Sequence, residues 1–250
     1  MDIPKDHPRY ASLATRERLA DFVRRGLMTP TGLISHGRGE AFDYLMGERT
    51  TDAALDAERV AAAYMLNAKN PVVCVNGNAA ALDAKRLIEF TAATDARIEV
   101  NIFHRTEERM RSLIEYMGSC GAVNVLGADP DSRIPGLSSD RALCTNEGIF
   151  SSDVILVPIE DGDRAEALVK MGKIVIAIDL NPLSRTSRAA TVSISDEMSR
   201  ALENMIRFAK ELKCNGEERN EIISQFSNAD NRRRTVDDIC GSLMSEADRR

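Results

Sequence analysis

Short apolar runs alternate with helix-like segments through the middle of the chain. The runs PVVCV, RIEVNIF, AVNVL, DVILVP and KIVIAI are rich in β-branched residues, as strands are. They predict strands over residues 71–75, 97–103, 122–126, 153–158 and 173–178. Apolar residues at spacings of three and four predict helices between them, over residues 79–91 and 107–117 and in a segment that ends at residue 171. Strands joined by helices predict βαβ units and a parallel sheet, and therefore an α/β fold.

Both ends of the chain have a helical pattern. Residues 16–25 carry Leu19, Phe22 and Val23 on one face and stop at Gly26, and residues 52–68 are rich in alanine, with Asp52 as the expected N-cap. The pattern is helical again after residue 197. We therefore expect one α/β domain over residues 1–250. Its expected parts are a helical N-terminal part (1–69), a βαβ core (70–196) and a helical C-terminal part (197–250).

The composition narrows the class of protein. Of the 250 residues 43% are apolar and 29% are charged, and the formal net charge is −6, which argues against a nucleic-acid partner. Five cysteines without a CxxC pair predict neither a disulfide framework nor a zinc site, and fit a reducing compartment. The segment MDIPKDHPRY lacks signal-peptide character, and no apolar run is long enough to span a membrane. We expect a cytoplasmic protein without a membrane partner.

Polar residues follow the predicted strands. In open parallel sheets, ligands bind beyond the carboxyl ends of the strands, so these residues are candidates for a site. They are Asn76-Gly77-Asn78, Asn101, Glu160-Asp161-Gly162-Asp163 and Asp179-Leu180-Asn181. The same residue types are common in plain turns, but four such ends at one sheet edge favour a site. Neither GxGxxG nor the GxxxxGK[ST] phosphate loop is present, which leaves a dehydrogenase unsupported.

Arginines indicate what the site binds. Arg185 and Arg188 lie in a segment rich in hydroxyls that follows the last strand, and guanidinium groups suit phosphate oxygens. The alternative there is a capped short helix with solvated arginines. The stretch LISHGRGEAFDYL places Arg38 between two glycines, next to His36. It is either an ordinary loop before a capped helix or a loop that binds an anion. Residues 105–109 are interpreted as a solvated helix start, and residues 138–148 as the longest loop within the α/β part.

We find no Ser-His-Asp constellation and no cluster with metal-ligand spacing, so no metal ligand is assigned. The residues by themselves indicate an α/β protein with an arginine-lined site for one or more phosphorylated ligands.

Several stretches together resemble one family, the archaeal phosphopantothenate synthetases, or 4-phosphopantoate–β-alanine ligases. They follow the family's order over about residues 3–200. The stretches are IPKDHPRY, GLISHGRGEAFDYLMGERT, VVCVNGNAAAL, IEVNIFHRTEER, RIPGL, VPIEDGDRAEALVKMGK and DLNPLSRTSRAA. The C-terminal helices match more loosely, since Ala229 stands where an aromatic residue is expected.

The resemblance implies a Rossmann-like core and an ATP-dependent ligase of coenzyme A biosynthesis. Such an enzyme joins 4-phosphopantoate to β-alanine through an acyl adenylate and releases AMP and pyrophosphate. It also implies a homodimer and magnesium bound with ATP. Two alternatives stay open: a ligase for unphosphorylated pantoate, and a nucleotide-binding regulatory protein without turnover.

The resemblance also assigns residues. The implied ATP-contacting residues are Arg16, Arg38, Asp179, Leu180, Asn181, Arg185, Thr186, Glu197 and Met198. We place the other substrate near His36, Asn76, Asn78, Asn101 and Arg105, because these lie at strand ends or in the glycine-containing stretch. Arg38 is expected to neutralise triphosphate charge, which makes it a catalytic candidate. His36 is the candidate acceptor for the proton of the attacking amine.

Overall fold

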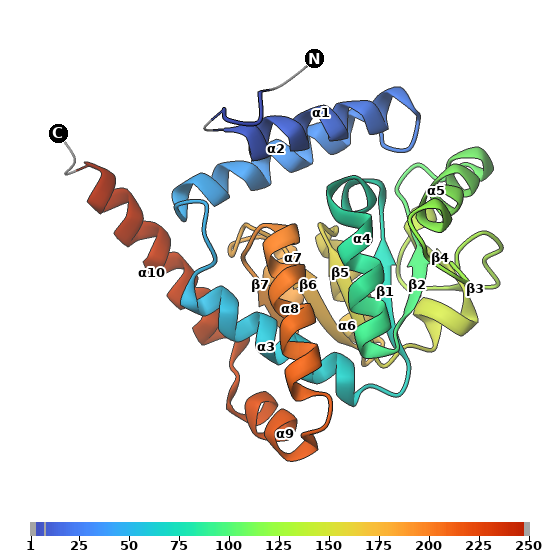
Figure 1. The fold of residues 1–250 in the computed structure, drawn as a ribbon. Helices are drawn as coiled ribbons and strands as arrows, with labels where there is room; N and C mark the ends of the chain where they lie inside the picture. Colours follow the sequence, from blue (N-terminus) through green and yellow to red (C-terminus); the bar gives the residue numbers. More distant parts are fainter. Residues whose placement is uncertain (1–3, 8, 248–250) are drawn as a thin grey trace.

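A five-stranded parallel sheet forms the centre of the molecule (Figure 1). The computed structural model describes residues 4–7 and 9–247. The strand order is β2-β1-β5-β6-β7 and all neighbours are parallel. The strands are β1 (Pro71–Val75), β2 (Arg97–Val100), β5 (Val154–Pro158), β6 (Ile174–Ile178) and β7 (Val192–Ile194). The predicted α/β fold with a mostly parallel, Rossmann-like sheet is confirmed.

Helices surround the sheet and form the first and last elements of the described part of the chain. They are α1 (Tyr10–Arg24), α2 (Pro30–Leu45), α3 (Asp52–Asn67), α4 (Gly77–Thr94), α5 (Glu107–Ser119), α6 (Gly162–Lys170), α7 (Arg185–Ala189), α8 (Met198–Leu212), α9 (Gly216–Gln225) and α10 (Asn228–Ala247). Figure 1 shows α1 and α2 side by side, and α10 runs from α3 toward the C-terminus. Residues 3 and 8 of the IPKDHPRY stretch lie outside the described residues.

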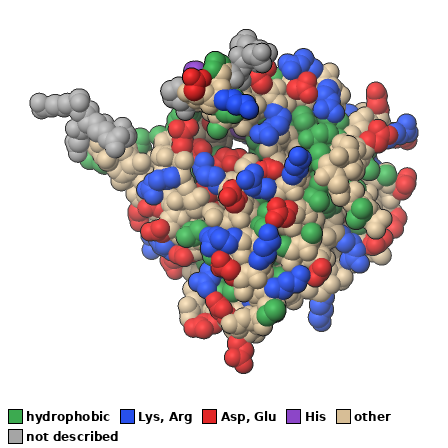
Figure 2. All heavy atoms as spheres, in the orientation of Figure 1, with side chains coloured by type: hydrophobic (Ala, Val, Ile, Leu, Met, Phe, Trp, Pro, Cys, Tyr) green, Lys and Arg blue, Asp and Glu red, His purple; other side chains and the backbone are tan. Residues whose placement is uncertain are grey.

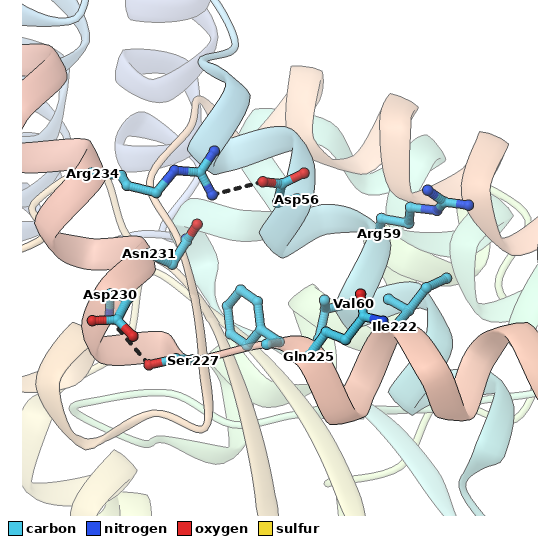
Figure 3. Close-up of a pocket in the computed structure, with 10 residues that line it drawn as sticks. Asp56, Arg59, Val60, Ile222, Gln225, Ser227, Asp230, Asn231 and Arg234 are labelled. Atoms are coloured by element: carbon cyan, nitrogen blue, oxygen red, sulfur yellow. Dashed lines mark hydrogen bonds and ion pairs between the residues drawn. The ribbon is translucent and has the colours of Figure 1, made fainter.

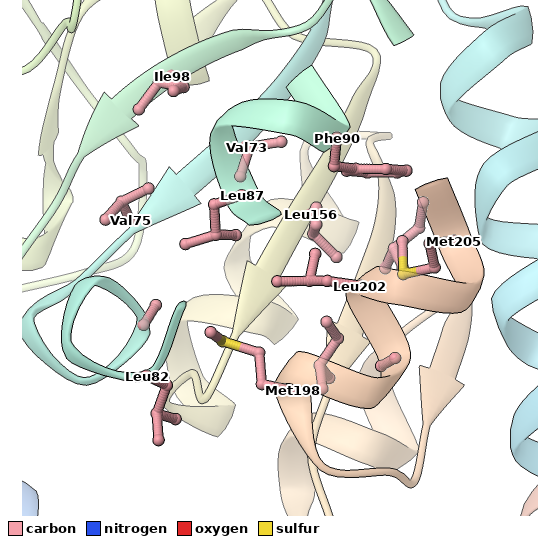
Figure 4. Close-up of a cluster of buried hydrophobic side chains, with 14 of the residues drawn as sticks. Val73, Val75, Leu82, Leu87, Phe90, Ile98, Leu156, Met198, Leu202 and Met205 are labelled. Atoms are coloured by element: carbon pink, nitrogen blue, oxygen red, sulfur yellow. The ribbon is translucent and has the colours of Figure 1, made fainter. Parts of the chain in front are cut away.

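The strands bury side chains on both faces, as their continuous apolar runs predict. In β1, Val73 and Val75 face a core built with α3, α4 and α8, which Figure 4 shows. Val72 and Cys74 face the opposite core, formed with α6 and residues 134–149. Successive side chains of a strand point to opposite faces, so one five-residue run contributes to both cores. Cys74 is 1% exposed and packs as a small hydrophobe, as predicted.

The predicted strand at 122–126 is wrong. Only Leu126 pairs with the sheet, in an isolated bridge to Glu99. Asn124 and Gly127 have φ values of 53° and 113°, and a left-handed backbone cannot continue a strand. Conversely, β7 was missed because its three residues are too few to form a recognisable pattern.

Residues 132–150 contain more structure than the predicted loop over residues 138–148. β3 (Ser132–Arg133) and β4 (Leu143–Cys144) form a short antiparallel pair. The buried Glu99 carboxylate of β2 accepts hydrogen bonds from Thr145 N, Thr145 Oγ1 and Ile149 N at 2.8, 2.9 and 2.7 Å. These bonds attach the segment to the edge of the sheet.

The HGRGE stretch is helical, which corrects its interpretation as a loop. It lies inside α2, which Pro30 starts with a φ suited to a first helical position. Glycine weakens a helix but does not end one unless the backbone turns left-handed. A Cβ on Gly32 would lie 2.6 Å from Asn78 Oδ1, so this glycine allows α2 to approach α4. Asp52 is also not the N-cap of α3: Thr51 Oγ1 accepts from Ala54 N.

The connectivity creates one crevice at the carboxyl ends of the strands. From β1 the chain forms β2 on one side, and it then crosses to β5 on the other side of β1. The carboxyl ends of β1 and β5 therefore flank a topological switch point, where open α/β sheets bind ligands.

The surface carries charges of both signs. Figure 2 shows acidic and basic side chains interspersed on the face that it draws. Among the described residues, no helix is long and apolar enough to cross a bilayer.

Candidate active site

Two adjoining cavities lie at the carboxyl ends of the strands. The large cavity has a volume of about 550 Å³ and the small cavity about 310 Å³. Both are within the size range of small-molecule sites. Three residues line both cavities: Ser35, Ile159 and Asp161. The cavities therefore meet beside the end of β5, at the switch point of the sheet.

One wall of the large cavity is apolar. Its apolar side chains are Phe42, Leu82, Ile159, Ile178, Leu180 and Met198. A Cβ on Gly39 would lie 3.5 Å from Leu180 Cδ1, so α2 packs closely over the loop that follows β6. A flat, apolar group such as a purine fits this composition.

Polar groups at the ends of β6 and β7 line another part of the large cavity. Asp179 accepts hydrogen bonds from Ser184 Oγ at 2.5 Å and from Asn181 N at 3.0 Å. Burial raises the pKa of Asp179, although these two bonds act in the opposite direction. Glu197 caps α8 by accepting from two first-turn N–H groups at 2.8 and 3.2 Å. Both carboxylates are thus fixed in position.

Cations and a histidine complete the large cavity. Arg38 is exposed and has no hydrogen-bond or ion-pair partner within the described part of the chain. Arg185 is paired with Glu166 at 3.0 Å. No side chain caps the N-terminus of α6, which begins at Gly162 in the cavity wall. Burial lowers the pKa of His36, while Glu40 acts in the opposite direction. This part of the cavity suits an anion.

A buried ion network connects α2 with the floor of the large cavity. Arg200 donates to Asp43 of α2 at 2.5 Å and to Asp196, a cavity residue, at 2.6 Å. Thr50 Oγ1 donates to Asp196 at 2.6 Å. Burial raises the pKa of the adjacent Glu58 to about 10, and the charge of Asp196 acts in the same direction. Glu58 is therefore neutral at pH 7, and the adjacent carboxylate that pairs with Arg200 is that of Asp196.

The small cavity is lined by amides and cations. Its polar residues include Asn76, Asn78, His104, Arg109 and Arg141. Asn78 Oδ1 and Arg141 Nε are buried without a hydrogen-bond partner among the described residues. Buried polar atoms of this kind are rare in folded proteins and are satisfied here if a ligand enters.

Glu160, which lines the large cavity, lies between two buried arginines, of which Arg141 lines the small cavity. Its carboxylate pairs with Arg141 on one side and Arg164 on the other, and all three side chains are at most 6% exposed. Burial alone would raise the pKa of Glu160, but the two guanidinium groups outweigh this and hold the pKa below its usual range. One carboxylate between two guanidiniums leaves a net positive charge, which favours anions in the cavities.

A strained residue forms the junction of the cavities. Ile159 has a φ of 52°, which is unfavourable for a β-branched side chain. Asn76 Nδ2 donates to the carbonyls of Pro158 and Ile159 at 2.9 and 3.1 Å, and Ile159 N donates to Ile178 O at 3.0 Å. The turn places the next two residues, Glu160 and Asp161, at the cavities. Backbone strain of this kind is concentrated at functional sites.

The structure brings most of the predicted site residues together. All the predicted ATP-contacting residues except Arg16 line the large cavity, as does His36. Arg16 instead pairs with Glu40 at 3.1 Å and links α1 to α2.

Of the five predicted acid-substrate residues, two line the small cavity, His36 lines the large one, and two line neither. Asn76 and Asn78 line the small cavity. Asn101 is 1% exposed and donates to the carbonyls of Arg141 and Leu143, so it supports the segment that carries Arg141. Arg105 donates to the carbonyls of Gly127 and Ala128 and lies outside both linings.

Sequence reasoning missed two cations of the small cavity. Arg109 was assigned to a solvated helix start, but its guanidinium donates to the carbonyls of Phe103 and His104 at 2.9 and 2.7 Å beside the cavity. Arg141 lies in the segment interpreted as a loop. Arg141 pairs with Glu160. The stretch at 160–163 marked Glu160 as a candidate site residue, but nothing in the sequence indicated that Arg141 pairs with it.

A further cavity of about 320 Å³ lies between α3, α9 and α10 (Figure 3). Its two arginines are paired, Arg234 with Asp56 at 2.7 Å and Arg59 with Glu218 at 2.5 Å. None of its lining residues is at a strand end. Both arginines of this cavity are thus paired with carboxylates, and the cavity lies away from the strand ends where the other two cavities lie.

Comparison with known proteins supplies a family. Residues 53–242 match the family described as phosphopantothenate/pantothenate synthetase. A protein of Methanosarcina mazei named 4-phosphopantoate–β-alanine ligase is 53% identical over 93% of this chain and 90% of its own length. Proteins of the same name from Methanospirillum hungatei and Thermococcus kodakarensis are 55% and 46% identical. They align with 84% and 96% of this chain, and with 86% and 91% of their own lengths.

The Glu160 ion group leads to a stability prediction. Glu160→Ala should lower the free energy of unfolding by about 3–5 kcal/mol, because it leaves two buried guanidinium groups without their counter-charge. Urea unfolding at pH 7 measures the loss. The matched control is Glu166→Ala, which removes an exposed carboxylate also paired with an arginine. Equal stabilities of the two variants would contradict the importance of the buried group.

Proposed function

The chain belongs to the phosphopantothenate/pantothenate synthetase family, and on that premise we propose that it is an ATP-dependent 4-phosphopantoate–β-alanine ligase. It would form 4′-phosphopantothenate, AMP and pyrophosphate in coenzyme A biosynthesis. The observation that carries the proposal is the pair of adjoining cavities at the switch point, one suited to a nucleotide and the other to a second anion. A reaction between two anionic substrates requires such an arrangement.

ATP would occupy the large cavity. Leu180, Met198 and Phe42 offer an apolar slot for adenine, and Asp179 lies at a strand end where it suits a ribose hydroxyl or the adenine amine. The triphosphate would extend toward Arg38 and the uncapped N-terminus of α6. Arg38 supports this orientation because its guanidinium has no partner within the described residues.

Magnesium would enter with the nucleotide. Among the described residues, no group of three or more His, Cys, Asp or Glu side chains is arranged to hold a metal. Mg²⁺ commonly keeps several water ligands and binds through substrate phosphates and one or two carboxylates, so this absence fits a magnesium–ATP complex. The ion would supply positive charge to the triphosphate.

4-Phosphopantoate would occupy the small cavity. Arg109, Arg141 and His104 offer donors for its phosphate, and Asn78 has an unsatisfied Oδ1 for its one hydroxyl. The carboxylate would then lie at the junction, next to the nucleotide. The net positive charge of the Glu160 ion group reduces the repulsion between the two anions.

The reaction has two steps. A carboxylate oxygen of 4-phosphopantoate attacks the α-phosphorus of ATP, and pyrophosphate leaves. The β-alanine nitrogen then attacks the carbonyl carbon, the bond to AMP breaks and the nitrogen loses a proton. The chain contributes by positioning the ligands and by placing cations where negative charge accumulates. The lowered pKa of His36 keeps its imidazole neutral, as a proton acceptor must be.

We propose a homodimer in the cytoplasm as the working form. Exposed apolar side chains on α2 and on α10, which touch each other, support a partner surface: Leu33, Ile34, Tyr44, Leu243 and Met244. Sedimentation velocity at micromolar concentration measures the state, and a monomer would contradict the dimer.

Product formation tests the function. AMP should appear when ATP, β-alanine and 4-phosphopantoate are all present. With unphosphorylated pantoate, kcat/KM should fall about 100-fold or more, because charge-assisted hydrogen bonds of about 1.5–3 kcal/mol each are lost. Equal rates with the two acids would favour the pantoate ligase. ATP binding without AMP release in a folded protein would favour the regulatory alternative.

Arg38 gives a sharper test of the nucleotide site. Arg38→Ala should lower kcat/KM about 10²–10³-fold, the typical effect of removing one donor to developing charge. Steady-state AMP formation measures the change, and circular dichroism checks the fold. Arg24→Ala on α1 is the control, since Arg24 is exposed and lines neither cavity. A near-normal Arg38→Ala enzyme would remove Arg38 from the mechanism.

A further inference from the structure

Asp161 is a carboxylate that the fold itself does not use. It occupies the N-cap position of α6, where aspartate normally accepts a hydrogen bond from the first turn. Here its side chain makes no capping bond, and it accepts no hydrogen bond from any described residue. The nearest cation is Arg141, whose Nη1 lies 3.6 Å from Asp161 Oδ2, beyond hydrogen-bond distance. The side chain is 52% exposed.

Asp161 also lies at the junction of the two cavities. Of the residues that the structure describes, only Ser35, Ile159 and Asp161 line both cavities, and Asp161 is the sole charged residue of the three. The strained turn at Ile159 brings it there. The carbonyl carbon of an acyl adenylate formed from ligands in the two cavities would lie at this junction.

The other acidic side chains that line the cavities already form ion pairs or hydrogen bonds within the protein. Glu160 is held between two arginines and Asp179 by Ser184 and a backbone N–H. Asp196 is held by Arg200, and Glu197 caps α8. Asp161 alone among the described acidic residues of the cavities accepts no hydrogen bond, and its one ion pair, with Arg141, is long at 3.6 Å. The amine substrate is a cation at neutral pH, so it requires an anion.

We propose that Asp161 binds the ammonium group of β-alanine at the junction and accepts one of its protons as the amine attacks the acyl adenylate. This inference rests on the proposed function and adds the site for the third substrate. In the step, one ammonium proton passes to the Asp161 carboxylate, which frees the nitrogen lone pair. The lone pair forms the bond to the carbonyl carbon, the carbon–oxygen bond to AMP breaks with its electron pair on AMP, and the nitrogen loses its second proton to water. Burial raises the pKa of Asp161, although Arg141 opposes it, which makes the carboxylate a better base than a free aspartate.

His36 is less well placed for this proton. It lines the large cavity and not the small one. Its neutral imidazole suits a donor or acceptor on the nucleotide side of the junction.

The two half-reactions separate the roles. ATP–pyrophosphate exchange with 4-phosphopantoate, without β-alanine, measures adenylation alone. Asp161→Asn should keep the exchange rate within about twofold of wild type, while β-alanine-dependent AMP formation falls about 10²–10⁴-fold, as for loss of a general base. Hydroxylamine is largely uncharged at neutral pH, so it should still trap the adenylate in this variant at near the wild-type rate. Asp161→Glu should recover part of the β-alanine reaction.

Asp163→Asn is the matched control. Asp163 lies two residues further along, is exposed and lines neither cavity. It should behave as wild type in all three assays. Loss of exchange in Asp161→Asn together with loss of ligation would place Asp161 in adenylation and overturn the proposal. An unchanged β-alanine rate would also overturn it. Absence of exchange in the wild-type protein would refute the ligase function itself, and the inference with it.

Discussion

The pairing of Glu160 with Arg141 and Arg164 is the interaction on which the site depends. Three charged side chains are removed from water at the point where the two cavities meet the sheet, at a desolvation cost that only close pairing offsets. The group joins three parts of the chain: the end of β5, the first turns of α6 and the segment between β3 and β4. Because two cations share one anion, positive charge remains beside the space where two anionic substrates are to react.

Other parts of the fold keep this arrangement in place. Glu99 and Asn101 fasten the segment that carries Arg141. Glu99 accepts two hydrogen bonds from backbone N–H groups and one from the Thr145 hydroxyl, and the Asn101 amide donates to two backbone carbonyls. Asn76 holds the strained turn at Ile159. A left-handed β-branched residue costs about 1–3 kcal/mol and persists only where its surroundings impose it. The strain is local, and the result is a carboxylate at the switch point that accepts no hydrogen bond from the described residues and lies 3.6 Å from its nearest cation.

Sequence patterns predicted those strands and helices that are determined by neighbouring residues in the sequence. β1, β5 and β6 are continuous apolar runs, and their limits agree with the structure to within one residue. The strand predicted near Asn124 and Gly127 failed because these residues have a left-handed backbone, which the sequence pattern does not show. The loop predicted at HGRGE failed because a helix accommodates its two glycines. For the site, strand ends and the family resemblance located most of the large cavity. Arg109 and Arg141 were missed because their importance comes from contacts across the fold, with loop carbonyls and with Glu160.

The charge distribution explains why three substrates meet at one place. Two of them are anions that repel each other, and the cations of both cavities lower that repulsion. The third is a zwitterion whose reactive end is a cation, so the same positive field would keep it away. A single carboxylate at the junction, Asp161, resolves this conflict: it lies where the cavities meet, while Arg141 lines the small cavity and Arg38 lines the large one. Glu160 could not take this part, since its charge is needed between Arg141 and Arg164. Two adjacent acidic residues at the end of β5 thus have different roles. The Glu160 side chain, 1% exposed, balances buried arginines, and the Asp161 side chain, 52% exposed, is accessible to a substrate.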